Sequence, residues 1–248
     1  MTALSASKSS ASELPGPTQV HLWLCPPERA EALDDSVLSE TERSRHRDAA
    51  LGRTWLRYLL TRYADVAPAD WVFETGRHGK PQLADELVQK VPLEFNLSHS
   101  GSWLVVAVTG GVPVGVDVQQ LERHRPVARL ARRYFSAPET EQLERLDGED
   151  YYRHFYRLWT LKEAWTKAHG GALPTALGEV GYRLDGSRLE CLVPGAAEST
   201  SQWLAEMEGH SLALCGLRRG LSLECLEWLG SGEIGALELQ AVASCGMA

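Results

Sequence analysis

Hydrophobic and polar residues alternate along several short segments of the chain, a pattern typical of strands with one buried face. These segments lie at 20–25, 71–76, 93–101, 102–111, 113–119, 179–186, 188–194 and 210–219. The stretch GRHGKP (76–81) breaks the pattern with Gly and Pro and predicts a loop. Because consecutive short strands favour hairpins, we expect mostly antiparallel sheet.

Hydrophobic residues at helical spacing predict two long helices. Ser39 and Glu42 form a capping-box pattern, and the helix that they open extends, with a break near Gly52, through RTWLRYLLTRYA (53–64). The second long helix covers FYRLWTLKEAWTKAHG (155–170). Two shorter helices are expected before it, one over 126–133 and one from a second capping box at Ser136 and Glu139.

The order strand, helix, strand, strand occurs twice, with a division near residues 110–113. This order predicts an α+β fold: a pseudo-twofold pair of similar halves, each with a small, mostly antiparallel sheet packed on a long helix. We expect a flexible N-terminal segment, an N-terminal half, a C-terminal half and a C-terminal extension, at 1–18, 19–112, 113–220 and 221–248.

Composition excludes several classes of protein. The chain has 248 residues, 44% of them hydrophobic, which is enough for a sizeable core, and it has no run of about 18 apolar residues that would span a membrane. Its five cysteines are scattered without a CxxC pair, so they favour neither a zinc site nor a disulfide framework. The N-terminus lacks the apolar stretch of a secretion signal, and we expect a cytoplasmic protein.

The net charge of −8 argues against nucleic-acid binding, yet arginines are concentrated in two segments, 43–62 and 121–133. Either cluster fits a solvated helix face or a specific anionic partner. In the strand 113–119, the valines share one face, while Asp117 and Gln119 share the other. That second face is either exposed to water or carries a buried acid with a function.

The helix 155–170 contains a second acid of interest. Glu163 lies one turn after Trp159 and one turn before Lys167, with Lys162 beside them. This describes either an ordinary surface helix that packs through its Trp, or a carboxylate and an ammonium held beside an anionic substrate. Lys162 fits a structural ion pair as well as a functional role.

Four separated motifs connect these observations: GKP (79–81), FNLSHSG (95–101), GVDVQ (115–119) and WTLKEAWTK (159–167). In this order they resemble the Sfp-type 4'-phosphopantetheinyl transferases, over residues from about 20 to about 219. The resemblance implies transfer of the phosphopantetheinyl arm of coenzyme A to a serine of an acyl or peptidyl carrier protein, with release of 3',5'-ADP. It also implies Mg²⁺, with Mn²⁺ as an alternative, and clients in fatty-acid, polyketide, nonribosomal-peptide or lysine biosynthesis.

The resemblance assigns roles to residues of these motifs. Asp117 and Glu163 are expected to hold the metal, Glu163 to take the serine proton, and Lys167 to contact the phosphate and steady the departing oxygen. Magnesium prefers oxygen ligands, and a serine hydroxyl needs a nearby base, so these residue types suit the chemistry. The residues expected to bind the phosphates or the nucleotide end of coenzyme A are Lys80, Pro81, Ser98 and His99.

The chain departs from the family pattern in two places. Many relatives carry Glu two residues after the metal-binding Asp, whereas this chain has Gln119, which we expect either to be a weaker metal ligand or to leave its place to water. The segment 44–60 is shortened, and Arg45 and Arg47 are the candidates to meet the 3'-phosphate of coenzyme A. The arginine-rich segment Arg123–Arg133 is expected to dock an acidic carrier protein.

Two other functions stay open at this point: a coenzyme A-binding module without transferase activity, and a magnesium-dependent phosphohydrolase that cleaves the pyrophosphate with water. A site formed between two halves of one chain favours a monomer.

Overall fold

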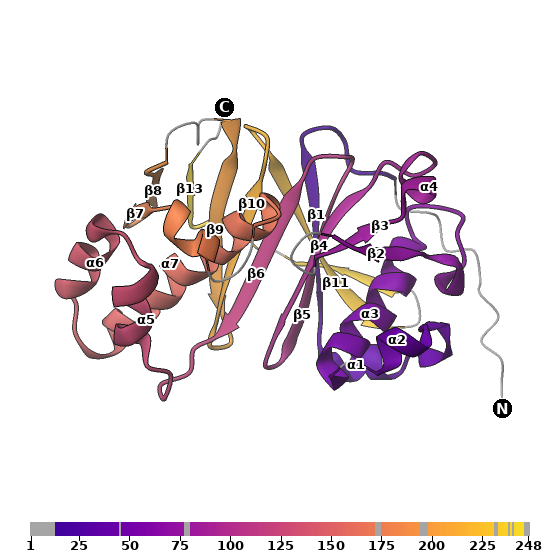
Figure 1. Ribbon diagram of the computed structural model, residues 1–248, viewed down its shortest axis with the longest axis horizontal. Helices are drawn as coiled ribbons and strands as arrows, with labels where there is room; N and C mark the ends of the chain where they lie inside the picture. The colour runs from indigo at the N-terminus through magenta and orange to yellow at the C-terminus, as the bar shows by residue number, and fades with distance from the viewer. Residues whose placement is uncertain are drawn as a thin grey trace.

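A computed structural model describes most of the chain (Figure 1). The described residues are 13–44, 46–76, 80–171, 175–193, 198–230, 233–237, 239 and 241–245. Residues 1–12 of the expected flexible segment lie outside these ranges, as does Arg45. Within the ranges, every helix is too short or too polar to cross a membrane.

Helices and strands fall into the two groups expected from the sequence. The α-helices are α1 (Pro27–Glu31), α2 (Glu40–Arg43), α3 (Arg47–Leu60), α4 (Asp85–Val88), α5 (Val127–Tyr134), α6 (Ala137–Glu144) and α7 (Gly148–Ala168). Short 3-10 helices are η1 (Asp35–Val37), η2 (Pro68–Asp70) and η4 (Thr175–Glu179). The strands are β1 (Gln19–Cys25), β2 (Phe73–Thr75), β3 (Pro81–Leu83), β4 (Glu94–Ser100), β5 (Trp103–Thr109), β6 (Val114–Gln120), β7 (Tyr182–Asp185), β8 (Arg188–Cys191), β9 (Thr200–Met207), β10 (His210–Gly216), β11 (Ser222–Gly230), β12 (Glu233–Ala236) and β13 (Ala243–Cys245).

The first sheet belongs mainly to the N-terminal half. Within the described residues it has five strands in the order β12-β11-β1-β5-β4, and all neighbours are antiparallel except β1 and β11. Helix α3 packs on one face of this sheet through a fully buried apolar stripe. The stripe consists of Trp55, Leu56, Leu59 and Leu60.

The second sheet belongs mainly to the C-terminal half. Within the same ranges it has six strands in the order β6-β10-β9-β13-β8-β7, antiparallel except for a short parallel contact between β8 and β13. Helix α7 packs on one face of it, where Leu161 and Ala164 meet Trp203 and Ala213. Strands β2 and β3 form a separate hairpin.

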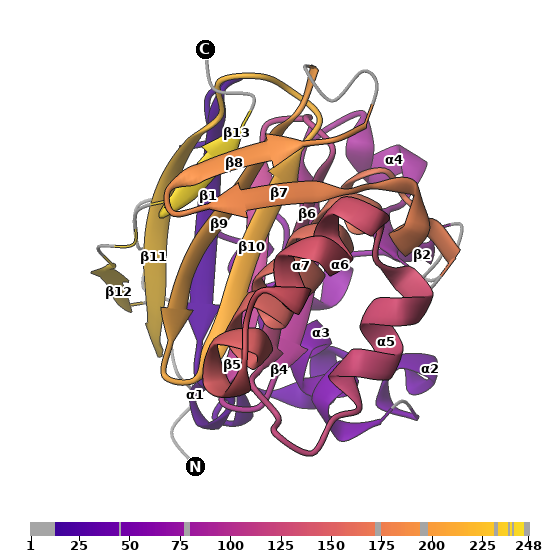
Figure 2. The same ribbon diagram turned by 90° about the vertical axis from the view of Figure 1, so that its left-hand side faces the viewer.

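The two sheets pack against each other between the two long helices (Figure 1). The valines of β6 turn toward the first sheet, where Val116 joins a core with Leu22 of β1 and Leu214 of β10. The opposite face of β6, which carries Asp117, lies against α7 (Figure 2). This face is buried, so the interpretation of 113–119 as a half-exposed strand is wrong.

The α+β class, the two halves and the mostly antiparallel sheets are confirmed. The predicted helix break near Gly52 is wrong. The Ser39 and Glu42 capping box opens only the short α2, and α3 begins separately at Arg47. Gly52 lies inside α3, where a Cβ atom would come within 3.0 Å of the Leu97 side chain. The glycine therefore allows α3 to approach β4 closely.

The sequence pattern does not predict β3, β9, β11, β12 or β13. Strand β3 begins at Pro81, the last residue of the segment expected as a loop. Segment 221–248, expected as a C-terminal extension, contributes β11 and β12 to the first sheet and β13 to the second.

Candidate active site

The edge strands β4 and β6 of the two sheets lie side by side and are joined by side chains. Backbone N–H groups of β6 donate to polar side chains of β4 at three places: Val116 to Asn96 (2.8 Å), Val118 to Ser98 (3.3 Å) and Gln120 to Ser100 (2.9 Å). Alternate residues of a strand share one face, so the polar positions 96, 98 and 100 all turn toward β6. They fix the register of the two halves and satisfy an otherwise unpaired strand edge.

Asp117 is the centre of a polar cluster at this junction, and only 1% of its surface is exposed. Its Oδ1 accepts hydrogen bonds from Ser98 Oγ at 3.0 Å and from Lys167 Nζ at 2.6 Å. The Lys167 ammonium also donates to Ser98 Oγ at 3.0 Å and to the Val116 carbonyl at 3.1 Å, so all three of its donors are used. Among the described residues, the buried Oδ2 of Asp117 has no hydrogen-bond partner.

The close contact between β6 and α7 depends on Gly115. A Cβ atom at this position would lie 2.0 Å from the carbonyl oxygen of Ala164 and 2.5 Å from the amide nitrogen of Ala168. Only a residue without a side chain allows the two backbones to touch here. The contact brings Glu163 and Lys167 of α7 within reach of the acidic face of β6.

Glu163 is buried beside Asp117. Burial is the main cause that raises the pKa of Glu163 to about 8, the Asp117 carboxylate adds to it, and Lys167 partly opposes both. A carboxylate that exchanges its proton near neutral pH suits a general base. One Glu163 oxygen also accepts a hydrogen bond from Gln119 Nε2 at 3.3 Å.

Gln119 is held on both sides of its amide. Its Oε1 accepts a hydrogen bond from Arg125 at 3.1 Å, and the Arg125 guanidinium lies 4.9 Å from the centre of the Trp159 ring. Because a guanidinium can only donate and a carboxylate can only accept, this orientation of the amide is consistent with both neighbours. The Gln119 oxygen therefore faces Arg125, while its nitrogen faces Glu163.

The donor set suits a hard divalent cation. Two carboxylates stand together, and within the described ranges one of the Asp117 oxygens is buried without a hydrogen-bond partner. In the part of the chain that the structure describes, no group of three or more His, Cys, Asp or Glu side chains is arranged so that it could hold a metal ion. Mg²⁺ is commonly bound by one or two carboxylates together with water and substrate phosphates, so these residues fit it.

Comparisons with known proteins identify the family of this chain. A family model described as the 4'-phosphopantetheinyl transferase superfamily matches residues 113–215, and a model of the N-terminal region of such transferases matches residues 30–110. A putative 4'-phosphopantetheinyl transferase of Synechocystis sp. is 34% identical over 172 residues, which are 65% of this chain and 69% of the relative. The chain belongs to the 4'-phosphopantetheinyl transferase superfamily. The resemblance inferred from the four motifs is confirmed.

Other phosphopantetheinyl transferases show comparable similarity. HetI of Nostoc sp. is 35% identical over 62% of this chain and 70% of its own length, and Sfp of Bacillus subtilis is 32% identical over 54% and 57%. Among solved structures, a holo-(acyl-carrier-protein) synthase of Bacillus anthracis in complex with coenzyme A (3',5'-ADP) gives a TM-score of 0.37 at 18% identity. That match covers 43% of this chain and 96% of the synthase.

The structure brings together five of the residues that the transferase motifs single out: Ser98, Asp117, Gln119, Glu163 and Lys167. It places the remaining ones elsewhere around β4. Lys80 donates to two backbone carbonyls, and Pro81 opens β3. His99 is exposed and lies on the face of β4 opposite to Ser98.

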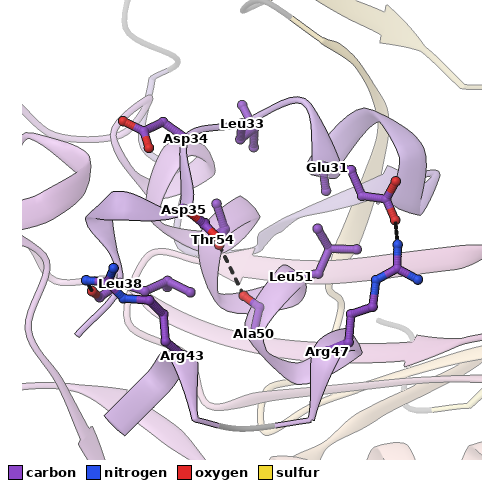
Figure 3. Close-up of a pocket in the computed structure, with 11 residues that line it drawn as sticks. Glu31, Leu33, Asp34, Asp35, Leu38, Arg43, Arg47, Ala50, Leu51 and Thr54 are labelled. Atoms are coloured by element: carbon purple, nitrogen blue, oxygen red, sulfur yellow. Dashed lines mark hydrogen bonds and ion pairs between the residues drawn. The ribbon is translucent and has the colours of Figure 1, made fainter. Parts of the chain in front are cut away.

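Arg47 lies apart from the Asp117 cluster. It pairs with Glu31 and lines a hollow of about 480 Å³ between α1, η1 and α3 (Figure 3). The hollow has a mixed lining, with acidic Asp34 and Asp35 beside apolar side chains such as Leu51.

Lys162 of the transferase motif has a structural contact. Its ammonium donates to Glu139 Oε2 at 2.8 Å and to the Val180 carbonyl, and neither Lys162 nor Glu139 has any exposed side-chain surface. Trp159 is buried, as expected, and stacks on Phe155, yet its indole N–H has no partner among the described residues. The sequence does not predict the contact of Arg125 with Gln119, because Arg125 lies in the turn before α5 whereas its partners lie on β6 and α7.

Proposed function

We propose that this enzyme transfers the 4'-phosphopantetheinyl arm of coenzyme A to a serine of an acyl or peptidyl carrier protein. The observation that carries the proposal is the buried cluster of Asp117, Glu163 and Lys167 at the junction of β4, β6 and α7. In this reaction the serine oxygen forms a bond to the phosphorus of the arm, the bond from that phosphorus to the bridging oxygen of the pyrophosphate breaks, and 3',5'-ADP leaves.

The chain's own residues supply the base and the positive charge. The Glu163 carboxylate, buried beside Asp117 and Lys167, takes the proton of the serine hydroxyl as the new bond forms. Lys167 lies beside both acidic groups and steadies the charge on the departing phosphate oxygen. When bound, Mg²⁺ or Mn²⁺ would be held by Asp117 and Glu163 and would neutralise charge on the pyrophosphate. Gln119 would become a further, weaker ligand only by turning its oxygen away from Arg125.

The nucleotide end of coenzyme A is assigned to residues around β4. Ser98, His99 and Pro81 are proposed to contact the phosphates or the nucleotide, and Arg45 or Arg47 the 3'-phosphate. The ion pair of Arg47 with Glu31 is exposed, so phosphate can compete for the guanidinium at little cost. Replacing Arg45 and Arg47 is expected to raise the KM for coenzyme A, and an unchanged KM for both rejects the assignment.

The carrier protein is proposed to dock on the arginine-rich surface Arg123–Arg133. Arg129, Arg132 and Arg133 of α5 are exposed, and their positive charge suits an acidic partner. The clients are carriers of fatty-acid, polyketide, nonribosomal-peptide or lysine biosynthesis in the cytoplasm. Because one chain supplies every element of the Asp117 cluster, a monomer is sufficient for activity.

The test is intact-mass analysis of an apo carrier protein after incubation with the enzyme, coenzyme A and Mg²⁺. A mass gain of one phosphopantetheine is expected, and it should disappear with EDTA or with Glu163→Gln. If several carriers gain no mass while coenzyme A still binds, the protein is a binding module. Breakdown of coenzyme A in the absence of any carrier would instead identify a phosphohydrolase.

A further inference from the structure

Lys80 belongs to the N-terminal half, yet its side chain bonds to the backbone of the C-terminal half. Its ammonium donates to the carbonyl oxygen of Val114 at 2.9 Å and to that of Lys167 at 3.2 Å. Val114 is the first residue of β6, and Lys167 lies in the last turn of α7. One side chain thus contacts both elements that carry Asp117 and Glu163.

Removing the charged Lys80 ammonium from water costs free energy, and the two hydrogen bonds to carbonyls offset this cost. Burial lowers the pKa of Lys80, Glu94 partly opposes this, and the neighbouring charge of Lys167 adds to it. The Lys80 backbone is itself fixed, because its carbonyl accepts a hydrogen bond from Gly76 at 2.8 Å in the β2–β3 hairpin. The half-buried Lys80 ammonium, close to the like charge of Lys167, is therefore stabilised here by its two carbonyl partners.

The bonded carbonyls lie where α7 and β6 touch. The last carbonyls of a helix have no N–H partner within the helix, and a cation near them is favoured by the helix dipole. The carbonyl of Lys167 also accepts backbone hydrogen bonds from Gly170, at 3.3 Å, and from the amide of His169 at the helix end. Gly115, whose position has no room for a side chain against α7, directly follows Val114. Lys80 therefore fastens α7 to β6 at the end of their closest contact.

We propose that Lys80 is a positioning residue, which fixes the C-terminal end of α7 on β6 so that Lys167 and Glu163 face Asp117. Its consequence for catalysis rests on the proposed transferase function. The fastening itself is a property of the fold and can be measured without turnover. Direct binding of a phosphate by the Lys80 ammonium is the competing role, and it predicts a different pattern of effects.

The test compares Lys80→Met, which keeps the apolar stem of the side chain, with Lys90→Met, which removes an exposed lysine of the same half. In Lys80→Met, amide hydrogen exchange at residues 168–171 should become about tenfold faster or more, because the end of α7 is released. The kcat for transfer should fall by about tenfold to 100-fold, and the Kd for coenzyme A should stay within about twofold. Lys90→Met should leave all three quantities unchanged, and Lys80→Arg, which retains the donors, should restore the exchange protection.

The alternative outcomes are distinct. A Kd for coenzyme A that rises about tenfold, with exchange and kcat unchanged, assigns the ammonium to phosphate and overturns the proposal. No change in exchange also overturns it. If the wild-type protein shows no transfer, the proposed function fails, whereas the exchange comparison still decides the role of Lys80. If Lys80→Met does not fold, Lys80→Gln should show the same changes with smaller magnitude: faster exchange at residues 168–171, a lower kcat and an unchanged Kd for coenzyme A.

Discussion

Replacing Lys162 by Met is expected to destabilise the protein strongly while leaving the Asp117 cluster in place. Lys162 and Glu139 form an ion pair at 2.8 Å without any exposed side-chain surface. The same carboxylate accepts hydrogen bonds from the backbone and hydroxyl of Ser136 at 2.7 and 2.9 Å, and from the backbone of Tyr182 at 3.0 Å. One ion pair therefore joins α6, α7 and the start of β7.

The size of the effect follows from the charge that is left behind. Without Lys162, the Glu139 carboxylate stays buried with no cation, and breaking a buried pair in this way costs about 3–5 kcal/mol. For a protein of this size, each kcal/mol lowers Tm by about 2–4 °C, so Tm should fall by about 6–20 °C. Adding Glu139→Gln removes the unpaired charge, and the double variant should be about 2 kcal/mol more stable than the sum of the single changes predicts.

The assay is urea and thermal unfolding of the wild type, the two single variants and the double variant at neutral pH, with Lys90→Met as the surface control. Transfer activity of the folded fraction, measured at low temperature, should stay within about threefold of the wild type, since the Lys162 ammonium bonds to Glu139 and Val180 rather than to the Asp117 cluster. A Tm decrease below about 2 °C, or strict additivity of the single changes, would refute the reasoning.

Three further predictions concern charge. Gln119→Glu adds a carboxylate next to the proposed metal ligands and is expected to lower the Mg²⁺ concentration for half-maximal activity on the order of tenfold, whereas an unchanged or higher value in a metal titration counts against a metal site at this position. Arg129→Glu should slow transfer to an acidic carrier at low salt, and the difference should fade at high salt; equal rates for variant and wild type at low salt would remove Arg129 from the docking surface. Burial lowers the pKa of His154 to about 4, and Arg157 adds to the shift. The folded state thus favours the neutral ring, so this contribution to stability is complete above pH 6.5 and is lost as the pH falls toward 4. Between pH 7 and pH 5, the free energy of unfolding in urea should fall by up to about 2 kcal/mol less in His154→Gln than in the wild type. An equal fall in both proteins would contradict the prediction.

Local patterns were enough to predict much of the fold and the centre of the site. The capping box of Ser136 and Glu139 is present as expected, because its bonds join residues only three positions apart. The motifs likewise predict that Asp117, Glu163 and Lys167 belong to one site. The capping box and the motifs of these three residues each lie at or within a single strand or helix, so the local sequence is enough to predict them.

The remaining features depend on partners far apart in the sequence. The carboxylate of Glu139 also binds Lys162, and nothing near either residue indicates that pairing. Arg125 reaches Gln119 only because the turn after β6 brings it back over Trp159. Strand β11 has charged residues whose partners, such as Arg29 for Glu227, come from the opposite end of the chain. The sequence of β11 carries no information about those partners, so it does not predict that the strand joins the first sheet.

The pairing of β1 with β11 also bears on how the protein is made. Gln19 lies opposite Ser222, so β1, after it leaves the ribosome, waits for a strand that is synthesised much later before its sheet is complete. Until then one edge of β1 has unpaired backbone groups, and its apolar side chains lack part of their cover. Contacts between residues so far apart in the sequence slow folding and prolong the exposure of apolar surface. Synthesis of this protein therefore carries a period of aggregation risk that ends only after residue 230 has emerged.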